Sequence, residues 1–254
     1  MFATAPELSW QTPREAVRLK CNEIHVWCAA LSNFENEFSQ FWAILSTAER
    51  ARAERFLFFK DRTNYVIRRG ILRVILGRYS GQLPSEIDFC YGRNGKPEIK
   101  KDRVRGPLYF NDSHSVDLAL YALTRACPIG VDVEQLREVP HIDEIASRFF
   151  SPCEVEMLMA LPTECRMESF FACWTRKEAV LKATGEGIAE GMSKVEVTRT
   201  PGEDAEFLRI GKEPRAGAEW HLRSFSPAPA YLGAVAFRHQ NLSLSKWRVP
   251  VPWG

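Results

Sequence analysis

The sequence predicts an α+β protein made of two similar halves, with the functional site at the interface between them. The chain has 254 residues, enough for one large domain or two closely packed halves. Hydrophobic residues make up 45% of the chain and charged residues 26%, as in globular proteins. Patterns typical of strands, helices and strands occur twice in this order, with an offset of roughly 105 residues and no evident repeat of the residues themselves. We therefore divide the chain into residues 1–126 and 127–254 and expect a ligand between the halves.

The first half begins with an expected strand followed by two expected helices. Residues 23–31 are apolar and rich in β-formers, which is typical of a strand. Ser46 followed by Glu49 forms a capping-box pattern, so a helix is expected to start there and to run through the basic segment. Residues 61–79 place large apolar side chains on one helical face. Strand patterns follow at residues 87–91, 108–110 and 116–123, with a turn at Asn94-Gly95 and a connection over residues 111–115.

The second half repeats this order. Ser151 and Glu154 form a second capping box, and Pro152 occupies the first helical position, so a helix is expected to begin there. A later helix is expected to end at Gly185. A strand is expected over residues 129–134, and this later helix over residues 170–184. Strands and turns are expected over residues 194–237.

Positive charge is concentrated in residues 46–80. This segment holds nine Lys and Arg residues and three acids, a local charge of +6, whereas the rest of the chain sums to −4. A focused positive region concentrates anions, which could be nucleic acid or a small polyphosphorylated ligand. The solvated face of a helix would explain the same charges, and charge alone favours that interpretation.

Other features of the composition argue against several classes of protein. The seven cysteines never form a C-x-x-C pattern, so we interpret them as reduced core residues, not as disulfides or zinc ligands. No apolar run approaches the roughly 18 residues of a membrane span. Residues 1–13 lack the apolar block of a signal peptide, and we expect a cytoplasmic protein.

Two acids lie close together on the strand expected over residues 129–134. The two-residue period of a strand places Asp132 and Glu134 on one face and Val131 and Val133 on the other. Neighbouring carboxylates repel one another unless water, a base or a cation compensates them, and oxygen ligands of this kind suit Mg²⁺. An exposed strand face would explain the pattern equally well.

The helix expected over residues 170–184 carries a second charged pattern. Trp174, Glu178, Leu181 and Lys182 follow the i, i+4, i+7, i+8 spacing of one helical stripe. An acid and a lysine among apolar neighbours are unlike a stripe that only faces solvent. An ordinary ion pair between Glu178 and Lys182 would explain the two charges but not their aromatic neighbour.

The connection expected over residues 111–115, Asn-Asp-Ser-His-Ser, combines hydroxyl groups with one histidine. Such a segment can offer donors to a phosphate or position a proton acceptor. A single histidine in a turn is more often structural. No Walker loop, dinucleotide fingerprint or nucleophile elbow accompanies the segment.

Several of these segments together resemble one enzyme family. The runs F-N-D-S-H-S, G-V-D-V-E, F-F-S-P-C-E and W-T-R-K-E-A-V-L-K-A-T-G are similar in order and spacing to those of the large, surfactin-synthetase-activating type of 4'-phosphopantetheinyl transferase. The R-R-G-I-L-R helix and the Y-G-R-N-G-K-P turn also match in order, so the similarity extends over most of the chain. It implies the pseudo-duplicated fold of that family, with coenzyme A and phosphate contacts in residues 1–126 and metal-binding motifs in residues 127–254.

The resemblance also implies a reaction and its residues. Members transfer 4'-phosphopantetheine from coenzyme A to a serine of an apo acyl or peptidyl carrier protein and release adenosine 3',5'-bisphosphate. By motif, Asp132, Glu134 and Glu178 are expected to hold Mg²⁺, while Glu178 and Lys182 are expected to be catalytic. The expected coenzyme A contacts are Arg52, Arg62, Lys96 (at the 3'-phosphate), Ser113, His114, Asp132, Lys177 and Lys182.

The chemistry of phosphoryl transfer agrees with these roles. Attack at a phosphorus surrounded by negative oxygens needs charge neutralisation and positioning more than covalent help. Mg²⁺ at the pyrophosphate and nearby lysines would supply both. We expect Glu178 to accept the serine proton, either directly or through a metal-bound water, because a metal-bound carboxylate is a weak base.

Asp112 departs from the family pattern, which usually has an apolar residue at this position. If its side chain faced the site, its charge would oppose phosphate binding, but strand alternation predicts that it points away from Ser113. The positive segment could serve an acidic carrier protein as well as coenzyme A. We expect a monomer that binds coenzyme A and a carrier protein, and neither nucleic acid nor a membrane.

Two other hypotheses stay open from the sequence alone. A nucleic-acid-binding protein that used residues 46–80 would leave the acidic strand and Glu178 unexplained, since carboxylates repel nucleic acid. A non-catalytic relative that binds carrier proteins would not need intact metal-binding acids.

Overall fold

The computed structural model of the chain describes residues 10–13, 17–92, 94–100, 106–187, 191–197, 207–210 and 220–251. Residues 1–9, part of the stretch in which no signal peptide is expected, lie outside this set. So do residues 198–206 and 211–219, part of the expected strand-and-turn region. Within the described ranges, no helix combines the length and apolar character needed to span a membrane.

The first half of the chain forms a sheet covered by helices. Its strands are β1 (Glu23–Ala30), β2 (Phe89–Tyr91), β3 (Pro97–Ile99), β4 (Tyr109–Ser115) and β5 (Leu118–Thr124), and its helices are α1 (Phe38–Ile44), α2 (Thr47–Glu54) and α3 (Phe59–Ser80), with 3₁₀ turns at Leu31–Glu37 and Pro84–Glu86. The predicted capping box at the start of α2 is confirmed, since the Ser46 side chain accepts a hydrogen bond from the Glu49 amide. However, α2 ends at Glu54 and does not continue through the basic segment.

The second half follows the same order of strand, helices and strands. Its strands are β6 (Ile129–Gln135), β7 (Val195–Val197), β8 (Phe207–Ile210), β9 (His221–Phe225), β10 (Tyr231–Phe237) and β11 (Ser243–Arg248), and its helices are α4 (Ile142–Phe149), α5 (Pro152–Met159) and α6 (Thr163–Thr184), with a 3₁₀ turn at Met192–Lys194. The Ser151–Glu154 capping box at the start of α5 is confirmed. Gly185 ends α6 with a φ of 76°, a left-handed conformation that favours glycine.

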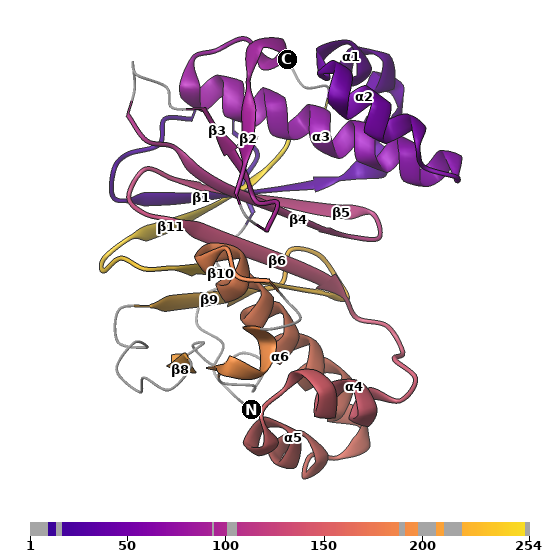
Figure 1. The fold of residues 1–254 in the computed structure, drawn as a ribbon, viewed down its shortest axis with the longest axis vertical. Helices are drawn as coiled ribbons and strands as arrows, with labels where there is room; N and C mark the ends of the chain where they lie inside the picture. The colour runs from indigo at the N-terminus through magenta and orange to yellow at the C-terminus, as the bar shows by residue number, and fades with distance from the viewer. Residues whose placement is uncertain are drawn as a thin grey trace.

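The two larger sheets lie between two groups of helices, with α1, α2 and α3 on one side and α4, α5 and α6 on the other (Figure 1), while β2-β3 and β7-β8 form separate two-stranded sheets. The strand order is β11-β1-β5-β4 in the first sheet and β6-β10-β9 in the second. Buried apolar side chains from both sheets, such as Leu120 and Val131, pack into a common core. The last strand, β11, pairs in parallel with β1, so residues 127–254 contribute a strand to the first sheet. The division at residue 126 remains a prediction.

The segment 111–115 is part of a strand, so the prediction of a connection there was wrong. β4 runs through Ser115, and its polar side chains reach the neighbouring strand β6 of the other sheet. Three contacts form this seam: Val131 N to Asn111 Oδ1 (2.9 Å), Ser113 Oγ to Asp132 Oδ1 (2.8 Å) and Ser115 Oγ to Glu134 Oε2 (2.7 Å). These hydroxyl and amide groups form hydrogen bonds between the sheets, which satisfies them in a buried position.

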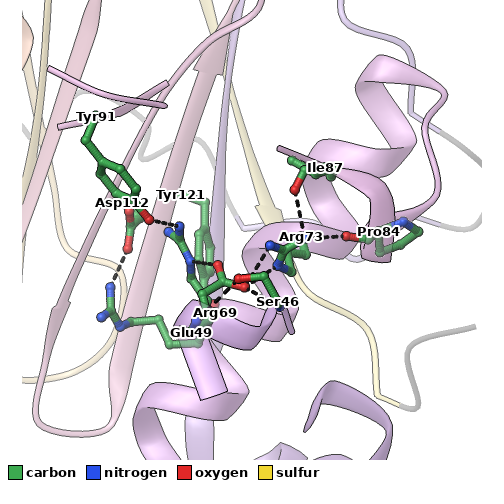
Figure 2. A network of polar contacts seen from close by, with 10 residues as sticks. Ser46, Glu49, Arg69, Arg73, Pro84, Ile87, Tyr91, Asp112 and Tyr121 are labelled. Atoms are coloured by element: carbon green, nitrogen blue, oxygen red, sulfur yellow. Dashed lines mark hydrogen bonds and ion pairs between the residues drawn. The ribbon is translucent and has the colours of Figure 1, made fainter. Parts of the chain in front are cut away.

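Each half contains a similar buried ionic clamp. In the first half, Glu49 of the α2 capping box binds Arg69 at 2.5 Å and Arg73 at 2.7 Å on α3 (Figure 2). In the second half, Glu154 of the α5 capping box binds Lys177 of α6 at 2.5 Å. Because the two clamps join equivalent elements of the two halves, they support the predicted pseudo-duplication. The predicted α+β fold of two similar halves is confirmed.

Candidate functional site

Four polar side chains from both halves meet at the interface, and we call Ser113, Asp132, Glu178 and Lys182 the seam cluster. Lys182 Nζ lies 2.6 Å from Asp132 Oδ1, 2.9 Å from Ser113 Oγ and 3.4 Å from Glu178 Oε2. Ser113, Asp132 and Glu178 are buried, whereas the Lys182 side chain is 24% exposed. The cluster is therefore largely desolvated but still reachable from solvent.

The local sequence explains why strand and helix meet at this point. Glu178 and Lys182 are four residues apart on α6 and therefore lie on one face of the helix. That face approaches β6 closely because Gly130 has no side chain. A Cβ atom at residue 130 would lie 2.0 Å from Ala179 O and 2.4 Å from Ala183 N, so any other residue would push the helix away.

The electrostatics of the cluster favour proton transfer at Glu178. Burial, followed by repulsion from Asp132 and Glu134, raises the pKa of Glu178 to about 7, while Lys182 opposes this rise. A carboxyl group with a pKa near neutrality is suited to act as a general base. Although burial opposes its charge, the neighbouring Asp132 and Glu178 raise the pKa of Lys182, so this side chain is a cation.

The acids of the site fit a hard cation by their chemistry. Asp132 Oδ2 is buried and, among the described residues, has no hydrogen-bond partner. Its unpaired lone pairs and the raised pKa of Glu178 show that negative charge here is incompletely compensated. Mg²⁺ typically takes one or two carboxylates together with waters and phosphate oxygens. Asp132 and Glu178 therefore fit such an ion.

The three predicted metal ligands do not form a ready-made ligand shell. No group of three or more His, Cys, Asp or Glu side chains in the described part of the chain is arranged to hold a metal ion. The Lys182 ammonium lies between Asp132 and Glu178. Glu134 instead accepts hydrogen bonds from Ser115 at 2.7 Å and from Arg137 at 3.2 Å. The structure thus brings Asp132 and Glu178 together and leaves Glu134 at the edge of the cluster.

His114 and Asp112 lie on the opposite face of β4 from Ser113. Arg68 of α3 donates a hydrogen bond to Asp112, whose charge is thereby compensated away from the cluster, as strand alternation predicts. His114 is exposed. Partial desolvation and the charges of Arg68 and Lys182 lower the pKa of His114 to about 4, so its ring is neutral at pH 7. A neutral imidazole can donate one hydrogen bond to a ligand that reaches this face of β4.

Lys177 lies away from the cluster, and its predicted phosphate contact stays a prediction. Its side chain is 0% exposed, forms the ion pair with Glu154 and places its ammonium 5.1 Å from the centre of the Phe150 ring. Neighbouring residues on an α-helix point about 100° apart, so Lys177 and Glu178 face different surroundings. Lys177 corresponds to Arg73 in the first half, and its position is that of a structural residue.

Arginines of the basic segment make contacts within the first half, and the predicted phosphate contacts of Arg52 and Arg62 stay predictions. Arg52 lies over the Tyr65 ring and Arg62 over the Trp42 ring, with guanidinium carbons 5.6 Å and 5.1 Å from the ring centres. Both contacts belong to the helical layer of the first half. The buried Arg69 and Arg73 of this segment are engaged by Glu49, and Arg68 by Asp112. Fewer positive charges are therefore available to a nucleic acid than the sequence suggests.

A cavity of about 790 Å³ is lined by residues of both halves, and none of the four residues of the seam cluster is among those that line it. The hairpin of β2 and β3 contributes Lys96 and Pro97, β4 contributes Tyr109, and the end of α6 contributes Thr184. Lys96 Nζ does not point freely into this space, because it donates to the carbonyl oxygens of Ile129 (2.9 Å), Lys182 (2.6 Å) and Ala183 (3.4 Å). Burial lowers the pKa of Lys96 to about 8.

Sequence reasoning missed part of the polar seam. Asn111 and Ser115 were grouped in a connection, although the polar residues 111, 113 and 115 already show the two-residue period of one strand face. Arg68, which compensates Asp112, had no sequence signal beyond its place in a basic segment. Asn94 was read only as a turn residue, yet its side chain donates to Gly185 O at 2.6 Å across the interface.

Comparisons with known proteins agree on one family. Residues 128–236 match the model of the 4'-phosphopantetheinyl transferase superfamily, and residues 30–125 match the model "4'-phosphopantetheinyl transferase, N-terminal". The chain is 38% identical over 228 residues to the 4'-phosphopantetheinyl transferase HetI of Nostoc sp., covering 90% of this chain and 93% of that protein. It is 33% identical over 207 residues to the 4'-phosphopantetheinyl transferase psf-1 of Bacillus pumilus, covering 81% and 84%. A holo-(acyl-carrier-protein) synthase of Bacillus anthracis, solved in complex with CoA (3',5'-ADP), aligns with 44% of this chain and 96% of its own, at 22% identity and a TM-score of 0.36.

Proposed function

The chain belongs to the 4'-phosphopantetheinyl transferases, and from this premise we propose that the seam cluster is the catalytic site of such an enzyme. The enzyme transfers the 4'-phosphopantetheine group of coenzyme A to a serine hydroxyl of an apo carrier protein. The oxygen of that serine forms a bond to the β-phosphorus of the pyrophosphate. The bond to the adenosine 3',5'-bisphosphate leaving group breaks, and the serine proton passes to a base.

Glu178 is the base in this proposal. Without a bound cation, its pKa of about 7 leaves a substantial carboxylate fraction at neutral pH while keeping enough basicity to accept a proton. The burial and the acidic neighbours that raise this pKa belong to the same cluster that would hold the pyrophosphate. Glu178 is 9% exposed, so the proton is received in a region with little competing water.

Lys182 supplies positive charge at the transferring group. Its ammonium already contacts Asp132, Glu178 and Ser113, so it is fixed before the substrate arrives and needs little reorganisation. The hydroxyl of Ser113 and the neutral ring of His114 would bind the nucleotide end of coenzyme A as hydrogen-bonding groups. The cavity of about 790 Å³ that the β2–β3 hairpin and the end of α6 line has space for that end.

Asp132 and Glu178 are the residues that would hold Mg²⁺, with Glu134 next to them. When bound, the ion would neutralise charge that develops on the pyrophosphate. Two observations support Mg²⁺ binding: Asp132 Oδ2 is buried without a hydrogen-bond partner among the described residues, and the neighbouring Glu178 carboxyl has a raised pKa. Arg52 and Arg62 would contribute more distant phosphate contacts from the helical layer. We further propose a cytoplasmic monomer that does not bind nucleic acid.

The experiment for this function measures the mass of apo carrier proteins after incubation with coenzyme A and Mg²⁺. We expect an increase equal to one phosphopantetheine group on at least one carrier among fatty-acid, polyketide and peptide-synthetase types. Asp132→Asn and Glu178→Gln should lose this activity while keeping a folded far-ultraviolet spectrum. No modification of any carrier by the wild-type protein, or near-normal rates in both variants, would refute the assignment.

A further inference from the structure

Four large apolar residues in a row connect α2 to α3, and we call Phe56, Leu57, Phe58 and Phe59 the apolar segment. Their exposed fractions are 38%, 94%, 70% and 78%. Phe56 turns partly inward, with its ring centre 5.4 Å from that of Tyr65, and so fixes the segment on its inner side. Single apolar side chains on a surface are ordinary, but a contiguous group of them typically marks an interaction site.

The residue at the start of α3 is a poor one for the stability of that helix. Phe58 occupies the N-cap position and, among the residues that the structure describes, its side chain caps no amide of α3, whereas Ser46 and Ser151 cap α2 and α5. Serine, threonine, asparagine and aspartate are preferred there because they accept a hydrogen bond from a free amide of the first turn. Since Phe58 is also largely exposed, folding does not account for an aromatic residue at this position.

The apolar segment lies at the end of the seam that is opposite the cavity. α3 runs against the direction of β4, because Ser80 at the end of α3 lines the cavity together with Tyr109, where β4 begins. Near the start of α3, Asn64 Nδ2 donates to the carbonyl oxygen of Val116, directly after β4, at 3.5 Å. The first turn of α3 and the segment before it are therefore on the side of the turn between β4 and β5. Val116 is itself 49% exposed and adds apolar surface there.

The seam cluster lies between these two ends. Ser113 is four residues after Tyr109 and three before Val116, which at the rise of a strand corresponds to about 13 Å and about 10 Å. If the nucleotide end of coenzyme A extends from the cavity to the cluster, the pantetheine arm and the acceptor serine approach from the other end. A standard protein–protein interface covers about 800 Å² on each partner, roughly 30 Å across. A protein whose serine reaches the cluster is therefore large enough to cover the apolar segment as well.

The charges around the apolar segment suit an acidic partner. Residues 50–62 hold five Lys and Arg residues and two acids, a local charge of +3. Arg55 and Lys60, which flank the segment, are both exposed. Apolar side chains within a basic rim fit a partner with an apolar centre and an acidic rim. A second copy of this chain would bring the same positive charge to the contact and would be repelled.

We propose that the apolar segment is part of the docking surface for the apo carrier protein, an inference that rests on the proposed function. Apolar side chains of the carrier would cover Leu57, Phe58 and Phe59, and acidic side chains would meet Arg55 and Lys60. The segment lies beyond the cluster from the cavity, so it contributes to the affinity for the carrier and not to the affinity for coenzyme A.

Phe58→Ser separates docking from folding, because it should change the two in opposite directions. A serine at the N-cap of α3 should raise the urea concentration at the midpoint of unfolding. At the same time, KM for the apo carrier that wild type modifies fastest should rise about tenfold, while kcat and KM for coenzyme A stay within about twofold of wild type. Calorimetric titration with the same carrier, its acceptor serine replaced by alanine, should show a Kd raised by a similar factor.

Three further variants accompany this one. Leu83→Ser is the matched control, because Leu83 is 61% exposed but follows the opposite end of α3; it should keep the wild-type KM for the carrier. Leu57→Ser removes a side chain that is 94% exposed, so it serves if Phe58→Ser does not fold, and it should raise the same KM at least threefold. Combining Arg55→Glu with Lys60→Glu should raise the KM at low salt and much less at about 0.5 M salt.

An unchanged KM for the carrier in Phe58→Ser, or an equal loss of affinity for coenzyme A, would overturn the proposal. With an unchanged KM, wild-type dimers that the substitution converts to monomers would assign the segment to a second copy. Binding of wild type to phosphatidylglycerol vesicles that the substitution abolishes would, in the same case, assign it to a membrane. Failure of the wild-type protein to modify any carrier would instead refute the proposed function, so the two failures are distinguishable.

Discussion

Replacing Lys177 by Met tests whether this lysine is structural or binds phosphate. The substitution keeps most of the apolar stem beside Phe150 but leaves Glu154 as a buried carboxylate without its cation. Breaking a buried ion pair in this way costs roughly 3–5 kcal/mol. Glu154 retains hydrogen bonds from Ser151 N (2.8 Å) and Val197 N (3.1 Å), so we expect the lower end, about 3 kcal/mol. In a chain of this size, that loss lowers Tm by roughly 6–12 °C.

Urea unfolding and steady-state kinetics on the same preparations decide the question. Arg73→Met is the comparison variant, since Arg73 binds Glu49 in the equivalent clamp of the first half; it should also lose stability, although Arg69 still compensates the charge of Glu49. We expect KM for coenzyme A to stay within about twofold of wild type in Lys177→Met at temperatures where the variant is folded. A stable Lys177→Met variant with a KM raised tenfold or more would show that the structural assignment is wrong and that Lys177 meets the substrate.

Three other measurements test the electrostatics and packing around the site. In metal-free wild type, the folded-state pKa of Glu178 of about 7 lies above the ordinary value of 4.5 for a glutamate, so its stabilising contribution is present at low pH and is lost as pH rises through 7. Between pH 5.5 and 8, the free energy of unfolding measured in urea should therefore fall by about 2 kcal/mol more in wild type than in the inactive Glu178→Gln variant. Equal decreases in the two proteins would contradict the raised pKa. Burial lowers the pKa of His25, so the stability that this neutral ring contributes is present above about pH 6.5 and is lost on acidification. In His25→Gln, the free energy of unfolding should therefore decline less steeply from pH 7 to 5 than in wild type. An unchanged slope would contradict the lowered pKa. Gly130→Ala would place a Cβ 2.0 Å from Ala179 O, so we expect a loss of roughly 1–3 kcal/mol in urea unfolding and a reduced kcat from displacement of α6; wild-type values in both would show that the helix can shift at no cost.

Periodicity and capping signals predicted the elements that position the site. The capping boxes at Ser46 and Ser151 mark helix starts correctly, because their geometry depends only on residues close in sequence. Strand alternation on β6 likewise separates Asp132 from the apolar Val131 and Val133 that pack in the core. The resemblance to a transferase family added the pairing of Asp132 with a distant helix, which no local pattern could supply.

What the sequence could not predict depends on contacts between segments that are distant in the chain. Residues 111–115 resemble a loop in composition, and they form a strand because partners on β6 satisfy their side chains. Lys177 and Lys182 carry the same charge on one helix, but only packing decides that the first meets Glu154 and the second Asp132. The contacts of Lys96 could not be predicted either, because its acceptors are backbone carbonyl oxygens, which residue types do not reveal.

The return of β11 to the first sheet ties the two ends of the chain together. Glu23 to Cys28 lie opposite Ser243 to Arg248 in register, and this pairing covers one edge of β1. A protein cut between the halves would expose that edge of β1, and exposed strand edges tend to pair with strands of other molecules. The two similar halves are therefore not separable modules. One edge of β1 stays unpaired until β11, near the end of the chain, has been synthesised.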